Sequence, residues 1–161
     1  MSFLSKSEIW SVDVYKVKHL DDIFNQINNL QPIFSLPKSK YRFKKDDPHT
    51  YADPFLFIWK DILYLFVETK SFNSPGKIEY FSSENFEDFD YQGTILSDKN
   101  HFSFPHIFED EGKIFMIPET SALGEIGLYK FEDFPNRISK VKNLIEGNFF
   151  DSSIIKINDI Y

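Results

Sequence analysis

The sequence predicts an all-β protein, a β-propeller made of four-stranded antiparallel blades. Three observations lead to this prediction: an internal repeat, two-residue turn signals between short apolar runs, and a high aromatic content. Phe alone occupies 19 of the 161 positions, and hydrophobic residues make up 42% of the chain. A disordered segment would not contain so much apolar side chain, so we expect a single domain over residues 1–161.

The repeat is seen in two pairs of similar segments. Residues 53–69 resemble residues 104–120, at an offset of 51 (104 − 53). Residues 78–86 resemble residues 126–134, at an offset of 48 (126 − 78), because the first copy has the longer loop. A third copy opens at Asp151, 98 positions after the first copy opens (151 − 53). The period predicts about two and a half blades.

The N-terminal part, residues 1–50, is expected to hold a strand and a short helix. The stretch Ile9 to Val17 alternates between apolar and polar residues, as a strand does. Apolar residues then follow helical spacing, and Asp21 and Asp22 stand in the first turn, where the helix dipole favours anions. The apolar positions of this helix are Leu20, Ile23, Phe24, Ile27 and Leu30. We expect this part to flank the sheets rather than to form a separate domain.

Each complete blade is expected to contain four strands. The pairs Lys60-Asp61 and Glu111-Gly112 each separate two short β-branched or aromatic runs, which is typical of hairpins, and Asn158-Asp159 does the same in the third copy. Near-continuous apolar runs are typical of strands that are covered on both faces. The predicted blades span residues 53–96 and 104–145, and a third blade starts at 151–161.

This number of blades is too small to close a ring, since propellers close with about four to eight. Three explanations stay open: a chain truncated from a longer one, a partner that completes the ring, or an open stack of sheets. Because the chain stops within the third hairpin, we expect a truncated fragment. Its open blade edges predict self-association, since unpaired strand edges recruit other chains.

Charge and composition disfavour several classes of protein. With 25 Asp+Glu against 18 Lys+Arg the net charge is −7, so we expect no nucleic-acid binding, which depends on Lys and Arg. No apolar run is long enough to span a membrane. The chain has no Cys, which excludes disulfides and thiolate metal sites, and we expect a cytoplasmic location. His101 and His106 lack the spacing of a metal site and no glycine-rich phosphate loop exists, so we expect no metal and no other cofactor.

The hairpin register predicts where polar side chains gather. With the turns centred at 60–61 and 111–112, Asp53 lies across from Glu68 and Phe104 across from Glu119. The first strands of all blades start at the same end of the channel, so carboxylates should surround one mouth of it. Carboxylates accept hydrogen bonds from sugar hydroxyls, and aromatic faces cover the apolar faces of sugar rings. The candidate carbohydrate-binding residues are Asp53, Glu68, Glu119, Asp151, Tyr51 and His106.

A structural role for these carboxylates is the alternative. The Glu-Thr pair recurs in both blades, whereas a catalytic group is normally needed once. This recurrence favours a structural role for Glu68 and Glu119. Asp53 is the strongest candidate for a functional group.

Three stretches resemble a known family: Tyr51-Ala-Asp-Pro-Phe-Leu-Phe, the segment from Phe102 to Ser121, and Phe150-Asp-Ser-Ser-Ile. Within the second stretch, Ile-Pro-Glu-Thr is the most specific mark. The chain resembles, over nearly its whole length, the N-terminal propeller domain of glucosamine inositolphosphorylceramide transferases and their bacterial relatives. The resemblance implies a five-bladed propeller that is distantly similar to arabinanases, xylosidases and fructosidases.

In those hydrolases, the resemblance implies, the base is the aspartate that matches Asp53. A second-blade aspartate tunes this base, and a third-blade glutamate is the acid. Here Phe104 stands at the second-blade position and the third blade is incomplete, so a full catalytic set is absent. We therefore do not expect the chain to be an active enzyme alone.

The sequence leads to one main functional hypothesis and two alternatives. The main one is a carbohydrate-recognising accessory propeller of a glycosyltransferase-associated, glycoconjugate-assembly protein, with a transferase domain as its partner. The first alternative is a glycoside hydrolase of the furanosidase-like group, inactive as truncated. The second is a propeller that binds other proteins.

Overall fold

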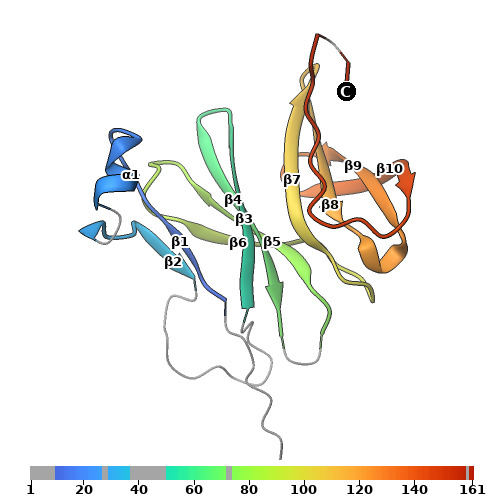
Figure 1. The fold of residues 1–161 in the computed structure, drawn as a ribbon, viewed down its shortest axis with the longest axis horizontal. Coiled ribbons are helices and arrows are strands. Elements are labelled where there is room, and N and C mark those ends of the chain that lie inside the picture. The colour runs from blue at the N-terminus through green and yellow to red at the C-terminus, as the bar shows by residue number, and fades with distance from the viewer. Residues whose placement is uncertain (1–9, 27–28, 37–49, 72–73, 159) are drawn as a thin grey trace, which may run out of the picture.

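Two four-stranded antiparallel sheets lie side by side, and a two-stranded ribbon covers the far side of the first sheet (Figure 1). In each sheet, consecutive strands pair, so the predicted all-β fold of four-stranded antiparallel blades is confirmed. The computed structural model describes residues 10–26, 29–36, 50–71, 74–158 and 160–161. Ile9, Ile27 and Asp159, which belong to predicted elements, lie outside these residues.

The first sheet, blade 1, consists of β3 (Thr50–Trp59), β4 (Ile62–Lys70), β5 (Lys77–Ser83) and β6 (Asp90–Leu96). The second sheet, blade 2, consists of β7 (Ser103–Asp110), β8 (Lys113–Glu119), β9 (Glu125–Asp133) and β10 (Arg137–Glu146). A 3-10 turn, η2 (Ser121–Leu123), connects β8 to β9. The N-terminal elements are β1 (Val12–Val14), α1 (Asp21–Gln26) and β2 (Phe34–Leu36).

The N-terminal elements are shorter than the sequence predicts. β1 covers three residues and pairs with β2, which the sequence pattern does not predict: Val12 pairs with Leu36 and Val14 with Phe34. In the third copy, the described residues form a single bridge between Ile157 and Ile160. This segment runs back alongside β7 (Figure 1), where Nζ of Lys156 lies 2.7 Å from Oδ1 of Asp110.

The predicted pairing of Asp53 with Glu68 is off by one residue. From the hairpin turn the ladder follows the predicted register as far as Phe55, and then it shifts so that Ala52 lies opposite Glu68. Pro54 has no N–H to donate to the ladder, and Asp53 leaves the extended conformation with a φ of 50°. Asp53 and Pro54 therefore form a β-bulge, a device that re-aims a side chain.

The bulge recurs where the repeat predicts it. In blade 2, Ser103 rather than Phe104 lies opposite Glu119, and Phe104 has a φ of 44° before Pro105. Asp151, at the start of the third copy, has a φ of 50°. All three residues stand in the left-handed region that non-glycine residues rarely occupy. The repeat is thus a repeat of backbone conformation as well as of sequence.

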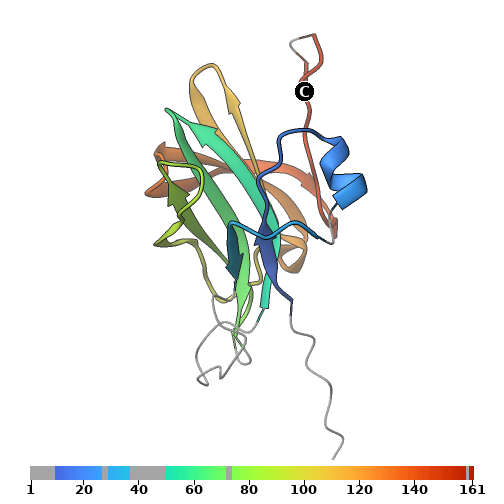
Figure 2. The same ribbon diagram turned by 90° about the vertical axis from the view of Figure 1, so that its left-hand side faces the viewer.

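Two apolar cores hold the sheets and the ribbon together. The first lies between the blades and contains side chains from both, such as Phe66 of β4 and Met116 of β8. The second lies between blade 1 and the ribbon, where Val12 and Phe34 pack with Leu65 and Phe81. Figure 2, viewed from the ribbon's side, shows β1 and β2 in front of blade 1. Blade 1 is therefore covered on both faces.

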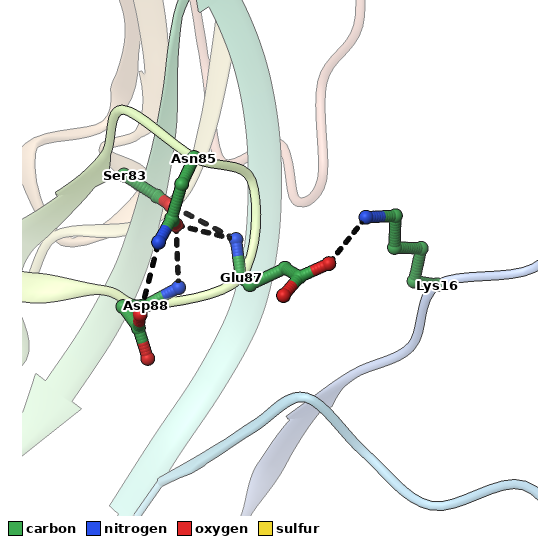
Figure 3. A network of polar contacts seen from close by, with 5 residues as sticks. All are labelled: Lys16, Ser83, Asn85, Glu87 and Asp88. Carbon is green, nitrogen blue, oxygen red and sulfur yellow. Dashed lines mark hydrogen bonds and ion pairs between the residues drawn. The ribbon is translucent and has the colours of Figure 1, made fainter.

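A polar turn between β5 and β6 meets the chain that follows β1 (Figure 3). Oδ1 of Asn85 accepts hydrogen bonds from the backbone N–H groups of Glu87 (2.9 Å) and Asp88 (2.8 Å), and Oγ of Ser83 accepts a third from Glu87. The carboxylate of Glu87 then pairs with Nζ of Lys16 at 2.5 Å. Because both side chains of the pair are exposed, this contact contributes little stability compared with the second core.

Phe134, in the turn between β9 and β10, inserts its ring into the core between the blades. Its ring centroid lies 4.8 to 6.4 Å from five other aromatic rings. These rings belong to Phe57, Trp59, Tyr64, Phe66 and Phe131. Four of them come from blade 1, so Phe134 joins the two sheets.

Replacement of Phe134 by Ala should lower the free energy of unfolding by about 2 to 3 kcal/mol, because the half-buried ring leaves a cavity between the blades. Phe24→Ala is the matched control, since Phe24 is 82% exposed and its loss should cost less than about 0.5 kcal/mol. Urea unfolding followed by intrinsic fluorescence measures both values. Equal losses in the two variants would contradict this role of Phe134.

Candidate functional site

The bulge at the start of blade 1 directs Asp53 toward blade 2. Oδ2 of Asp53 accepts a hydrogen bond of 3.1 Å from the backbone N–H of Phe104, the bulge residue of the next blade. A charge-assisted bond of this kind is stronger than one between neutral groups. It fixes the start of β7 against the start of β3, so Asp53 has a structural role in addition to any role toward a ligand.

Glu119 makes the corresponding link between blade 2 and the third copy. Its Oε2 lies 3.4 Å from the backbone N–H of Asp151, and its Oε1 accepts a hydrogen bond of 2.8 Å from Oγ of Ser121. Phe104, which occupies the position of Asp53 in the repeat, has no side-chain oxygen to offer. The glutamate at the end of β8 therefore supplies the bond that an aspartate supplies in blade 1.

Glu68 is equivalent to Glu119 in the repeat but has different partners. Asp53 already accepts the hydrogen bond from the N–H of Phe104, so Glu68 does not need to bind that group. Its side chain is 9% exposed, and its Oε1 lies 3.3 Å from Nε2 of His101. Nδ1 of His101 in turn accepts a hydrogen bond of 3.0 Å from the backbone N–H of Gly76.

Gly76 allows this arrangement because it has no side chain. A Cβ at this position would lie 2.5 Å from Oε1 of Glu68 and 2.6 Å from Cε1 of His101, both closer than non-bonded atoms approach. The carbonyl of Gly76 also accepts a hydrogen bond of 2.9 Å from the N–H of Phe102. The loop before β5 and the loop before β7 thus enclose the carboxyl group of Glu68.

Burial and like charges hold a proton on Glu68. Burial, the main cause, together with the neighbouring carboxylates of Asp53 and Glu119 raises the pKa of Glu68 to about 7, and Lys70 opposes this shift. Burial also lowers the pKa of His101. Nε2 of His101 thus lies within ion-pair distance of Glu68, while burial opposes the charged form of both groups.

The structure brings together only part of the predicted site. Asp53, Glu68 and Glu119 are close enough for their charges to interact, and Asp151 adjoins Glu119 with its own side chain exposed. Tyr51 packs against the core between blade 1 and the ribbon. The binding roles of these residues stay predictions.

His106 lies beyond the bulge on β7, among aromatic rings. Its ring centroid is 5.3 Å from that of Phe55 and 6.1 Å from that of Phe108, and the ring lies beside the backbone of Ile154. Burial lowers its pKa, and its buried Nε2 has no hydrogen-bond partner among the described residues. His106 therefore lines the contact between β7 and the third copy, and its binding role also stays a prediction.

Within the described parts of the chain, no three His, Asp or Glu side chains are grouped so that they could hold a metal ion. Nor does any described helix have the length and apolar character needed to cross a membrane.

Comparison with known families shows which family the chain belongs to. The family model described as glucosamine inositolphosphorylceramide transferase 1, N-terminal, matches residues 37–161. The chain belongs to this family. The resemblance predicted from the sequence is therefore confirmed.

Curated relatives agree with this family. A glucosamine inositolphosphorylceramide transferase 1 from Arabidopsis thaliana is 36% identical over 112 residues, which are 68% of this chain and 15% of the relative. Proteins of the same name from Oryza sativa subsp. indica and subsp. japonica are each 33% identical over 112 residues, with the same coverage. The chain spans about 15% of the length of the curated relatives that it matches.

A search of solved structures gives a GH32 β-fructofuranosidase from Bombyx mori, a mutant in complex with sucrose. The identity is 19%, the TM-score is 0.49, and the match covers 65% of this chain and 26% of the other. The assignment of the fold rests on the two four-stranded sheets themselves.

Sequence reasoning missed His101 and Gly76 as site residues. The available signal was the drop in the repeat offset from 51 to 48, which marks a longer loop between β4 and β5 in blade 1. Gly76 ends this loop, and its contact with His101 depends on the packing of two blades. Sequence spacing does not predict that contact.

Replacement of Glu68 by Gln should make stability less dependent on pH. The pKa of Glu68 is higher in the folded protein than in the unfolded chain, so ionisation between pH 4.5 and about 7 favours unfolding. Gln carries no charge and keeps an oxygen for His101. Relative to the parent, Glu68→Gln should therefore gain roughly 2 to 3 kcal/mol as the pH rises through this window, and nothing more above it.

Urea unfolding at a series of pH values measures this gain. Glu111→Gln is the matched control, because it removes one carboxylate from the exposed turn between β7 and β8. A constant difference between Glu68→Gln and the parent from pH 4.5 to 8 would show that Glu68 ionises normally.

Proposed function

We propose that this chain is a carbohydrate-recognising propeller domain of a glycosyltransferase-associated protein, and that sugar binds beside Asp53, Glu68 and Glu119. Family membership supports a glycoconjugate context. The single observation that carries the proposal is the grouping of the carboxyl groups of Asp53, Glu68 and Glu119 at the starts of the blades. A neutral carboxyl group donates a hydrogen bond, whereas a carboxylate only accepts, so the group of residues suits hydroxyls that do both.

Recognition is favoured over hydrolysis by the contacts of Asp53. Its Oδ2 is bound to the N–H of Phe104, and Phe104 stands where the hydrolases keep a second aspartate. An amide or carboxylate at position 53 can make this bond, whereas a hydrolytic base must also be free to take a proton. The site therefore supports binding better than turnover.

The ring itself is part of the proposal. We propose that the two blades belong to a five-bladed propeller, as the family resemblance implies. We also propose a location in the cytoplasm, which the lack of Cys permits. The outer face of blade 2 supports further blades, because it carries a pocket of about 190 Å³ lined mainly by apolar side chains. These include Phe108, Phe115, Leu128 and Leu144. Self-association through such open faces stays a prediction.

Asp53→Asn should weaken sugar binding without abolishing it. The amide keeps the hydrogen bond to Phe104 but loses the charge-assisted part of its contact with a ligand, on the order of 1 to 2 kcal/mol or about 5- to 30-fold in Kd. Chemical-shift titration with methyl glucosaminide and its N-acetyl derivative measures this change. The first sugar carries an amine charge that carboxylates attract, and the second lacks it.

Asp61→Asn is the control for the loss of one negative charge, since Asp61 lies in the exposed turn at the other end of the β3–β4 hairpin. Its Kd should equal that of the parent. Sugar release from an aryl glycoside by the parent chain, lost in Asp53→Asn, would instead favour the hydrolase. Equal Kd values for Asp53→Asn and Asp61→Asn would return Asp53 to a structural role alone.

A further inference from the structure

We infer that His101 is a positioning residue that stays a neutral imidazole, so that a proton taken up by the pair His101–Glu68 resides on Glu68. Glu68 is then the hydrogen-bond donor among the three carboxyl groups at the starts of the blades. The inference rests on the proposed function for its ligand, a sugar hydroxyl, but the placement of the proton is a property of the protein alone. It follows from three contacts: Gly76 with His101, His101 with Glu68, and Phe102 with Gly76.

The backbone fixes the tautomer of His101. Nδ1 accepts the N–H of Gly76 at 3.0 Å, and a nitrogen that accepts a hydrogen bond carries no proton. The single ring proton of the neutral imidazole then lies on Nε2, which is 3.3 Å from Oε1 of Glu68. His101 therefore accepts from the backbone and turns its proton-bearing nitrogen toward Glu68.

The same contact opposes the formation of an imidazolium ion. A proton on Nδ1 would point at the N–H of Gly76, and two donors would face each other at hydrogen-bond distance. That N–H cannot easily turn away, because the carbonyl of Gly76 is bound to the N–H of Phe102. When the pair takes up a proton, the proton therefore goes to Glu68.

The charged groups around the pair act in both directions. Asp53 of β3 and Glu119 of β8 disfavour a further negative charge on Glu68, whereas Lys70 at the end of β4 favours it. Lys70 also disfavours a positive charge on His101, whereas Glu119 and Asp53 favour it. Burial, which is the largest cause for both groups, favours the neutral form of each.

Glu68 thus differs from the other two carboxylates of the mouth. Asp53 and Glu119 accept hydrogen bonds from backbone N–H groups of the next repeat. Among the described residues, the polar contact of Glu68 is with His101, and it lies at Oε1. The other oxygen, Oε2, is left to carry the proton and to donate it to a hydroxyl.

The test follows the two groups by NMR in the chain of 161 residues at low micromolar concentration. Carbon chemical shifts of the Glu68 carboxyl group, assigned with Glu68→Gln, report its ionisation. Ring nitrogen shifts report the tautomer of His101, with the exposed His19 as an internal reference. We expect Glu68 to ionise near pH 7 while His101 keeps its proton on Nε2 from pH 5 to 8. An imidazolium signal from His101 above pH 6, with Glu68 ionised, would overturn the inference.

Two variants separate positioning from simple packing. His101→Gln keeps a donor for Glu68 and should keep its ionisation near pH 7. His101→Leu removes the group that favours the ionised form of Glu68, so the midpoint of the Glu68 titration should move upward by about one pH unit or more. Equal midpoints in the parent and His101→Leu would overturn the positioning role. If His101→Leu does not fold, the titrations of His101→Gln and of the parent still decide where the proton resides.

Sugar binding distinguishes this inference from the proposed function. With methyl N-acetylglucosaminide, which has no charge, affinity should fall about 5-fold or more between pH 6 and pH 8, and His101→Gln should retain this profile. The expected titration without any sugar binding would refute the proposed function and leave the proton on Glu68. Binding that does not change with pH would overturn the donor role of Glu68.

Discussion

The hydrogen bond from the N–H of Phe104 to the carboxylate of Asp53 sets the geometry of the whole mouth. It links two β-bulges, one at the start of each blade, and both bulges exist because a proline follows a residue with positive φ. A regular ladder would place residue 53 across from Glu68. The bulge instead moves Asp53 out of the ladder toward the next blade. The face of blade 1 that carries the first core packs against blade 2.

A single substitution within the repeat explains why equivalent glutamates behave differently. Blade 2 has Phe104 where blade 1 has Asp53, so Glu119 supplies the oxygen that binds the N–H of the third copy. Blade 1 keeps its aspartate, and Glu68 is left buried beside His101. The recurrence of Glu-Thr suggested a common structural role, but only Glu119 has one of this kind. Loss of symmetry in the repeat thus leaves Glu68 without the backbone partner that Glu119 has.

Much of the fold could be predicted from the sequence because its signals are local. The turn pairs at residues 60–61 and 111–112 and the short apolar runs between them determine the hairpins, and the offset between copies determines the blades. The three-residue strand β2 and the one-residue shift at Asp53 could not be predicted in this way. The first depends on a partner strand, and the second on how φ and a missing N–H combine at one position.

The site was harder to predict than the fold, for a physical reason. The grouping of Asp53, Glu68 and Glu119 follows from strand register, but the protonation of Glu68 follows from what surrounds it. His101 and Gly76 approach Glu68 from two loops that belong to different blades, and no periodicity relates them. Since burial is the largest cause of the raised pKa of Glu68, the chemistry of the mouth is determined by the packing of blade 1 against blade 2. A sequence pattern can thus place a carboxylate at the mouth, while its charge state depends on contacts between blades.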